Sequence, residues 1–388
     1  MGIVKPNYKV IVPKAEGKFE IQWKDCFSEL SALLQNSGYK PFRICVFIHV
    51  INEMDCSLKS DMIRASFYGL ENGNVWPYAI IPQSPEEPNN VIIELGMVSE
   101  KDGMVEYHSV DGLNYCTITS GEHTECWIVG ARSDGECANI YESAKGSFQK
   151  VKSVLESTGM NFDSIVRQWN YVDGILGSSP FNESIMQHYQ IFNEVRNSYY
   201  SQYRKSKSFP AATGIGMNSS QVGLDCYAIG NYSTVQIIPI SNPNQQDSYQ
   251  YGQEVLVGDP FIRKQPPQFE RAILLKSGPI SKLIISGTAS IIGQKTIGIG
   301  DVDLQTRITI ENIEALASRT NLGTHCLNSE DYPDKYSYLR VYVKNRSDIS
   351  VVRELCIKHF GDIPATFVQA DICRDNLLVE IEAEKMNV

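Results

Sequence analysis

The stretch CFSELSALLQNSGYKPFRICVFIHV, residues 26–50, predicts the fold because it joins an amphipathic helix, a glycine-containing turn and a buried strand. The same order occurs again at residues 142–172 and, with a longer loop before the strand, at residues 303–344. A helix, a turn and a strand that recur in this order indicate an internal repeat. The sequence therefore predicts three related units in one chain.

Further segments match around each repeat. The strands that precede the second and third copies end at Ser120–Gly121 and Ser286–Gly287. After each copy we expect a second helix, a proline and a closing hairpin. Each unit then forms an α+β sandwich of roughly 110 to 150 residues, an ordinary domain size. We place the units at residues 1–105, 106–262 and 263–388, and the first lacks a recognisable first hairpin.

Composition excludes several classes of protein. With 388 residues, of which 42% are hydrophobic, the chain can bury large cores. A net charge of −10 without a basic stripe argues against nucleic acid binding. No apolar signal segment and no apolar run of about 18 residues occur, so we expect a cytoplasmic protein with no membrane partner. Ten cysteines without a C-x-x-C motif predict reduced core thiols.

The alternating segment LLVEIEAE, residues 377–384, raises a question about its acidic residues. Glu380 and Glu382 share one side of the expected strand, and Val379 and Ile381 share the other. An ordinary half-buried strand would turn both glutamates toward water. The alternative is a functional pair in a cleft, and the segment alone leaves both interpretations open.

The third unit resembles a known superfamily over its whole length. Residues 268–384 carry QFERAILLKSG, SKLIISG, YLRVYVK and PATFVQADICRDNLLVEIEAE, and they resemble a domain of the RidA/YjgF superfamily. That family forms homotrimers with ligand clefts between neighbouring subunits. Three such units in one chain imply an intramolecular pseudo-trimer, and hence a monomer. The first unit shows no residues that we would assign to catalysis, and we interpret it as a scaffold.

A more specific resemblance is to chorismatases, multi-unit relatives of RidA that release pyruvate from chorismate. It is carried by ATGIG (212–216), FERA (269–272), SGTASI (286–291), LRVYV (339–343) and QADICRDNLLVEIE (369–382). The resemblance implies that Glu380 is the catalytic acid. It also implies that Cys373, together with Gly287, marks the members that form 3-hydroxybenzoate. We therefore expect an enzyme of aromatic secondary metabolism that cleaves chorismate to pyruvate and a hydroxybenzoate.

The chemistry of this reaction fits the residue types. Cleavage requires a proton on the enolpyruvyl methylene, and a carboxylic acid in an apolar cleft can keep its proton near neutral pH. Glu380 is our candidate for this general acid. Cys373 could act as a nucleophile or a proton shuttle on the ring, or it could be inert packing. The reaction requires no cofactor, and the sequence shows neither a phosphate-binding glycine loop nor a metal-ligand cluster.

A substrate with two carboxylates requires cationic partners, preferably arginine. Arg353, on the second helix of unit three, stands where RidA-like proteins place a ligand-facing asparagine, and Arg196 has the equivalent place in unit two. Phe269 matches a cleft aromatic of RidA-like proteins, and Arg271 follows two residues later. Each of these residues could also be a solvated or a packing residue. Because Gly287 has no side chain, substrate could lie close against the backbone of the strand at Ser286–Gly287.

Departures from both families leave alternatives open. RidA-like imine deaminases grip substrate with the arginine of a Pro-Ala-Arg segment, but here Thr366 and Ala212 hold that position, which argues against imine hydrolysis. We keep Thr366 as a candidate substrate contact. Chorismatases carry further arginines in unit two, about where this chain has His188 and Asn244. Two alternatives remain: a non-catalytic module that binds a small carboxylate or a partner protein, and an imine or enamine deaminase of the RidA kind.

Overall fold

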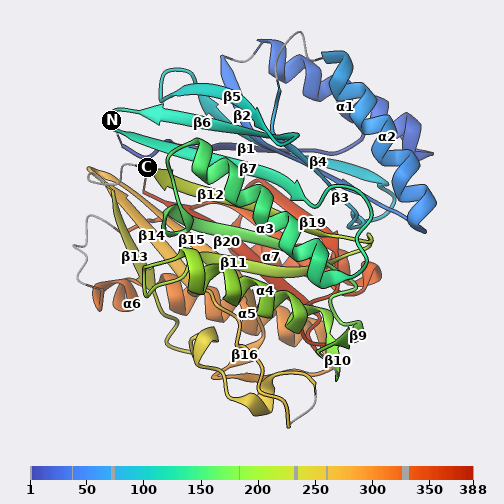
Figure 1. The fold of residues 1–388 in the computed structure, drawn as a ribbon. Coiled ribbons are helices and arrows are strands. Elements are labelled where there is room, and N and C mark those ends of the chain that lie inside the picture. Colours follow the sequence, from blue (N-terminus) through green and yellow to red (C-terminus); the bar gives the residue numbers. More distant parts are fainter. Residues whose placement is uncertain are drawn as a thin grey trace.

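Three β-sheets with helices on their outer faces make up the computed structural model (Figure 1). It describes residues 2–36, 38–70, 75–182, 184–230, 235–258, 261–325 and 332–387. The first sheet and its helices consist of β1 (Asn7–Ile11), α1 (Phe19–Asn36), β2 (Tyr39–Ile48), α2 (Glu53–Leu70), β3 (Tyr78–Ile81) and β4 (Val91–Ser99). The second consists of β5 (Met104–Val110), β6 (Leu113–Ser120), β7 (His123–Arg132), α3 (Ile140–Ser157), β8 (Ile165–Asp173), α4 (His188–Tyr203), β11 (Ala211–Met217) and β12 (Val222–Gly230).

The third sheet and its helices have the same plan. They consist of β13 (Gln236–Ile240), β14 (Ala272–Ser277), β15 (Ile280–Ala289), α5 (Val302–Ala317), α6 (Arg319–Gly323), β18 (Lys335–Val343), α7 (Ile349–Phe360), β19 (Ala365–Gln369) and β20 (Val379–Met386). Smaller elements are the hairpins β9–β10 (Ser178–Phe181, Ser184–Gln187) and β16–β17 (Ile291–Ile292, Lys295–Thr296), and short 3-10 turns.

Strand order confirms the three predicted units. The sheets run β1-β4-β2-β3, β5-β6-β7-β12-β8-β11 and β13-β14-β15-β20-β18-β19. In each of them the strand after the first helix has the last strand on one side, antiparallel, and a parallel strand on the other. The first sheet lacks the additional strand pair that extends the other two, as the sequence indicates.

The predicted closing hairpin is wrong. β19 pairs with β18 in parallel at the sheet edge, whereas β20 lies between β15 and β18. The reason is burial, because almost every residue of β20 is shielded on both faces and such a strand occupies the middle of a sheet. The two strands therefore flank β18 and do not contact each other as a pair.

The unit boundaries remain a proposal, and one observation bears on the second of them. β13 pairs with β14 and so belongs to the third sheet, although residues 106–262 include it. A boundary between β12 and β13 would keep every sheet within one unit, and we propose it in place of residue 262.

The inner faces of the three sheets pack against one another. One apolar cluster draws on all three units, including Phe47 of β2, Trp169 of β8 and Tyr342 of β18. Three further clusters lie between each sheet and its own helices. The protein thus has one core per unit and a fourth core in the middle, which is the arrangement expected of a pseudo-trimer.

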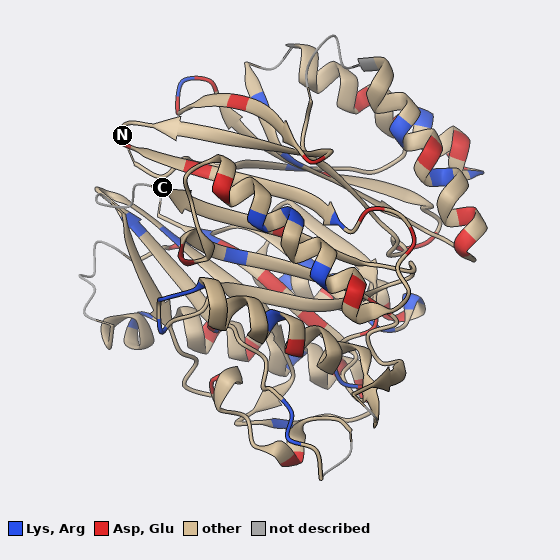
Figure 2. Cartoon of the chain, in the orientation of Figure 1, with Lys and Arg blue, Asp and Glu red and all other residues tan. Residues whose placement is uncertain are grey.

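A ring of buried ion pairs crosses this central core. Each unit contributes an arginine from its middle strand and a carboxylate from its last strand, and each arginine reaches the carboxylate of a neighbouring unit. The pairs are Arg43 with Asp225 (3.2 Å), Arg167 with Glu382 (2.7 Å) and Arg340 with Glu94 (Nε–Oε2 2.9 Å). Figure 2 shows charged segments of both signs on the strands between the helix layers. The ring therefore joins unit one to unit two, unit two to unit three, and unit three to unit one.

Two other predictions concern cysteines and membranes. The nine cysteines in the described ranges are free thiols, six of them buried, and Cys326 lies outside those ranges. Among the helices of the described residues, none combines the length and the apolar character that a membrane crossing needs.

Candidate functional site

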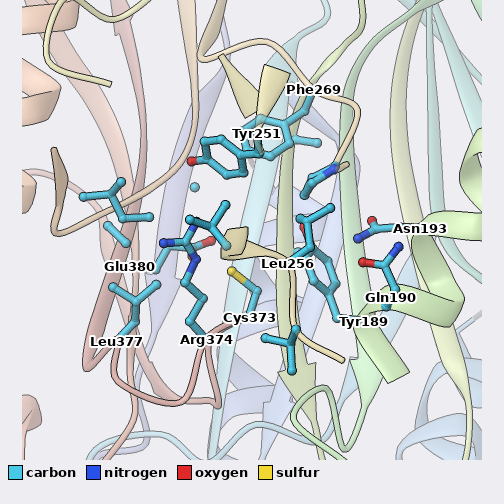
Figure 3. Close-up of a pocket in the computed structure, with 18 of the residues that line it drawn as sticks. Tyr189, Gln190, Asn193, Tyr251, Leu256, Phe269, Cys373, Arg374, Leu377 and Glu380 are labelled. Atoms are coloured by element: carbon cyan, nitrogen blue, oxygen red, sulfur yellow. The ribbon is translucent and has the colours of Figure 1, made fainter. Parts of the chain in front are cut away.

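A cavity lies between unit two and unit three, and its volume, open mouth included, is about 700 Å³. Unit three contributes β15 and β20, and unit two contributes α4 and β11. A connecting segment that includes Tyr251 and Leu256 closes one side. Figure 3 shows Glu380 and Arg374 on the side opposite Gln190 and Asn193, with Cys373 between them and Phe269 and Tyr251 at one end.

Glu380 lines this cavity with only 5% of its surface exposed. Burial raises the pKa of its carboxyl to about 8, and the neighbouring charge of Glu382 acts in the same direction. Arg167 and Arg271 oppose this shift without cancelling it. The carboxyl is therefore protonated at neutral pH and faces a cavity in which it can give up its proton.

Glu382, two residues along the same strand, is in the opposite state. Burial by itself raises its pKa, but Arg167 and Arg340 outweigh burial and hold the pKa below its usual value. Its carboxylate accepts hydrogen bonds from Arg167 (2.7 Å), Trp169 (2.6 Å) and Thr213 (2.6 Å). The interpretation that both glutamates face water is wrong, because this side of β20 faces the neighbouring unit.

Gly287 makes room for the Glu380 carboxyl. A Cβ atom at this position would lie 2.1 Å from Oε1 of Glu380, a distance at which the carboxyl must move. The backbone N–H of Gly287 donates to Oγ1 of Thr213 (3.1 Å), the same hydroxyl that donates to Glu382. We expected bare backbone beside the substrate here, and the structure places Glu380 against that backbone.

Cys373 and two arginines lie next to the acid. Burial, followed by the charge of Glu380, raises the pKa of the Cys373 thiol to about 12, so the sulfur is a thiol at neutral pH. Nη2 of Arg271 donates to the hydroxyl of Tyr251 (2.7 Å), and Nη1 of Arg374 donates to the carbonyl of Gln294 (2.8 Å). Both guanidinium groups lie within 6 Å of the Tyr251 ring, at the edge of the cavity.

The α4 face of the cavity carries residues that the sequence analysis missed. Tyr189, Gln190 and Asn193 line it, and Gly214 leaves space for the Tyr189 ring, which a Cβ atom there would meet at 2.7 Å. Arg196 lies one layer behind, where its Nη2 donates to Oδ1 of Asn193 (2.7 Å). The helical spacing of 189, 193 and 196 could have indicated a shared face.

Two predicted substrate contacts lie elsewhere. Arg353 forms an ion pair with Glu86 of unit one, Nε to Oε2 2.6 Å, and its guanidinium lies over Phe367. Thr366 is fully buried in β19, a strand whose Val368 forms a β-bridge with Pro85 of unit one. The reason is that each cleft joins the last strand of one unit to the second helix of the preceding unit, so α7 faces unit one and α4 faces Glu380. We no longer propose either residue as a substrate ligand.

Three further residues that the sequence analysis named, Ser286, His188 and Asn244, form hydrogen bonds within the protein and do not line the cavity. Ser286 accepts from the N–H of Ala212 (2.9 Å) and donates to the carbonyl of Glu270 (2.6 Å), so it joins the two units beside the cavity. His188 contacts the carbonyl of Asp173, and Asn244 contacts Asn312. None of the three is part of the cavity wall. Phe269 and Arg271 do line it, as predicted for unit three.

No group of three His, Cys, Asp or Glu side chains in the described ranges is arranged to hold a metal ion. The polar groups of the cavity are instead a protonated carboxyl, a thiol, two guanidinium groups, three amides and two tyrosine hydroxyls. Such a set suits an organic anion that receives a proton.

Comparisons with known proteins agree on one family. The family model "Chorismatase FkbO/Hyg5-like, N-terminal" matches residues 102–229. A 3-hydroxybenzoate synthase of Streptomyces hygroscopicus is 30% identical over 305 residues, which cover 71% of this chain and 84% of that protein. A chorismatase of Streptomyces rapamycinicus is 32% identical over 227 residues, 58% of this chain and 64% of that protein.

A solved chorismatase crystal structure shares the fold. It superposes with a TM-score of 0.70 and covers 98% of both chains at 19% sequence identity. Almost the whole chain, including the first unit, therefore has a counterpart in that structure.

Proposed function

The chain belongs to the chorismatase family, and we propose that it cleaves the enolpyruvyl ether of chorismate to pyruvate and 3-hydroxybenzoate, with Glu380 as the general acid. The observation that carries this proposal is a buried carboxyl with a pKa of about 8 on the wall of an inter-unit cavity. Purified protein incubated with chorismate tests it. Pyruvate release followed with lactate dehydrogenase, and 3-hydroxybenzoate identified by chromatography, are the expected results.

The first step is proton transfer from Glu380 to the methylene carbon of the enolpyruvyl group. Positive charge then develops on the carbon that bears the ether oxygen, and water or a ring hydroxyl captures it before pyruvate leaves. The two products together contain the atoms of chorismate, so no water is consumed overall. Glu382 stays ionised beside Glu380, and its negative charge helps to keep the proton on the acid before the reaction.

Arg271 and Arg374 are the cavity cations that we propose for the two carboxylates of the substrate. Both lie on the cavity wall, and hydrogen bonds to the surrounding chain fix their positions. Arg271 donates to Gln246 and Tyr251, and Arg374 donates to Gln294. Arg196 acts indirectly, because it orients the amide of Asn193. Ala212, and not an arginine, faces the cavity from β11, which leaves the imine deaminase alternative without its substrate-gripping group.

Cys373 is proposed to act as a protonated thiol on the ring. A pKa of about 12 makes a thiolate nucleophile unfavourable, whereas an S–H group can pass a proton during aromatisation. We expect the variant Cys373→Ala to release pyruvate but to form less 3-hydroxybenzoate and more non-aromatic dihydroxycyclohexadiene acid. Chromatographic product ratios measure this. An unchanged ratio would assign Cys373 to packing.

The variant Gly287→Ala is expected to lower kcat because the new methyl group displaces the Glu380 carboxyl. We expect a decrease of about tenfold or more, since misplacement of a catalytic group by 1 Å can cost roughly 100-fold. Steady-state pyruvate release measures the effect. Gly69→Ala, on helix α2 with no neighbouring atom near the added Cβ, is the control for a general effect of glycine replacement. Wild-type kcat in Gly287→Ala would contradict the close packing.

A further inference from the structure

The pseudo-trimer places a second open cleft between unit one and unit two. It is lined by α2 and β3 of unit one and by β7 and the loop after it in unit two. Its volume, including the part that is open to solvent, is about 1560 Å³. In the catalytic cavity, α4 and β11 stand in the places of α2 and β3, and β15 stands in the place of β7. The two clefts therefore occupy equivalent places in the fold.

Strand register identifies the residues that replace the catalytic ones. In unit three, Ala289 pairs with Glu380 across β15 and β20, and in unit two, Arg132 pairs with Gly223 across β7 and β12. Two residues after each of these last-strand positions come Glu382 and Asp225, the carboxylates of the central ring. The second cleft therefore has a glycine where the catalytic cavity has its acid, and an arginine where the catalytic cavity has an alanine.

Arg132 is a half-buried cation without a carboxylate partner among the described residues. Its Nη2 donates to the carbonyl of Ile80 (2.6 Å). No ion pair joins Arg132 to any carboxylate of the described residues. Burial lowers the pKa of its guanidinium, which shows that the surrounding charges do not compensate for the loss of water. A bound anion would supply that compensation.

The other charged groups of the cleft are already paired or face water. Arg64 forms an ion pair with Asp61 (2.9 Å), and Lys150 forms one with Asp134 (2.6 Å), whose side chain is 85% exposed. Neutral hydrogen-bonding groups make up much of the remaining polar wall: Ser57, Asn114, Ser133 and Gln221. A planar guanidinium fork among neutral donors suits a carboxylate, which it can bind through two parallel hydrogen bonds.

We propose that the cleft between unit one and unit two binds a small organic carboxylate through Arg132. Because Gly223 stands in place of the acid, the ligand is bound and not cleaved. The third cleft offers no such site, because Arg353 and Glu86 form an ion pair between α7 and unit one. One fold thus holds a chemical cleft and a binding cleft, and this proposal does not depend on the reaction catalysed at Glu380.

The test uses 3-bromobenzoate as the probe, because the anomalous signal of bromine locates it in crystals of the full chain. We expect a bromine peak in the cleft with the carboxylate on the guanidinium of Arg132. In calorimetric titrations we expect Arg132→Met to weaken binding at this site by roughly tenfold or more, the value of one charge-assisted hydrogen bond. Arg64→Met is the matched control, because that exposed arginine of the same cleft already has a partner.

The proposal is supported if Arg132→Met loses the bromine peak and one binding event while its melting temperature is unchanged. Arg64→Met should keep both the peak and the binding event. Bromine beside Glu380 alone, or binding to Arg132→Met that equals wild type, overturns it. If Arg132→Met does not fold, Arg132→Lys replaces it, because lysine keeps the charge but loses the two-pronged geometry and should still bind the probe more weakly.

Discussion

Glutamine at position 380 is expected to lower kcat for pyruvate release from chorismate by roughly 10²–10⁴-fold, the usual contribution of a positioned general acid. The amide has nearly the size of the carboxyl but no acidic proton to transfer to the methylene carbon. Single-turnover measurements with the purified variant quantify the effect. A variant that releases pyruvate at the wild-type rate would remove Glu380 from the mechanism.

The pH dependence gives an independent check on the same group. Because the acid form is the active one, kcat/KM of the wild type should fall as pH rises through about 8. The folded carboxyl has a raised pKa, so its favourable contribution to stability is complete below about pH 4.5 and is lost as pH rises to about 8. Glu380→Gln should therefore be at least as stable as the wild type at pH 8, and urea denaturation can show that its inactivity is not unfolding.

Methionine in place of Arg340 is expected to lower the free energy of unfolding by about 3–5 kcal/mol, the cost of removing one partner of a buried ion pair. Arg340 is fully buried, donates to Glu94 (2.9 Å) and Tyr171 (2.8 Å), and lies 3.8 Å from Glu382. Its loss removes the nearest cation of Glu94 and leaves Arg43, at 3.5 Å, as the remaining one in the buried central core. Urea denaturation followed by circular dichroism measures the change.

Two controls give this prediction its specificity. Arg307→Met breaks an exposed pair with Asp303 on one helix, and it should leave the urea midpoint unchanged. The double variant Arg340→Met/Glu94→Gln should recover part of the loss, because it also removes the buried charge of Glu94. The deficit of Arg340→Met should also shrink as pH falls below about 4.5. Arg340 holds the pKa of the folded Glu94 below its usual value, and the stability that this provides is lost when Glu94 becomes protonated. A deficit that is independent of pH would contradict this account.

The sequence by itself determined the units and much of the chemistry. The repeated order of helix, turn and strand is local, so it could be read along the chain, and the three sheets confirm it. Five of the residues singled out in the sequence come from unit three and line the same cavity: Phe269, Arg271, Gly287, Cys373 and Glu380. Glu380 of β20 and Gly287 of β15 lie close together because these two strands pair, and the predicted closing hairpin did not anticipate that pairing.

Tertiary structure alone decided which neighbour completes the site. Arg353 and Arg196 occupy equivalent helices and looked alike in sequence, yet Arg353 faces unit one and Arg196 lies behind the wall that faces Glu380. The alternation of Glu380 and Glu382 likewise could not say whether that side of the strand meets water or another unit. A periodic pattern records the side of an element on which a residue lies, but the burial, the raised pKa and the cations of a site depend on what packs against that side, and here this is a unit distant in sequence.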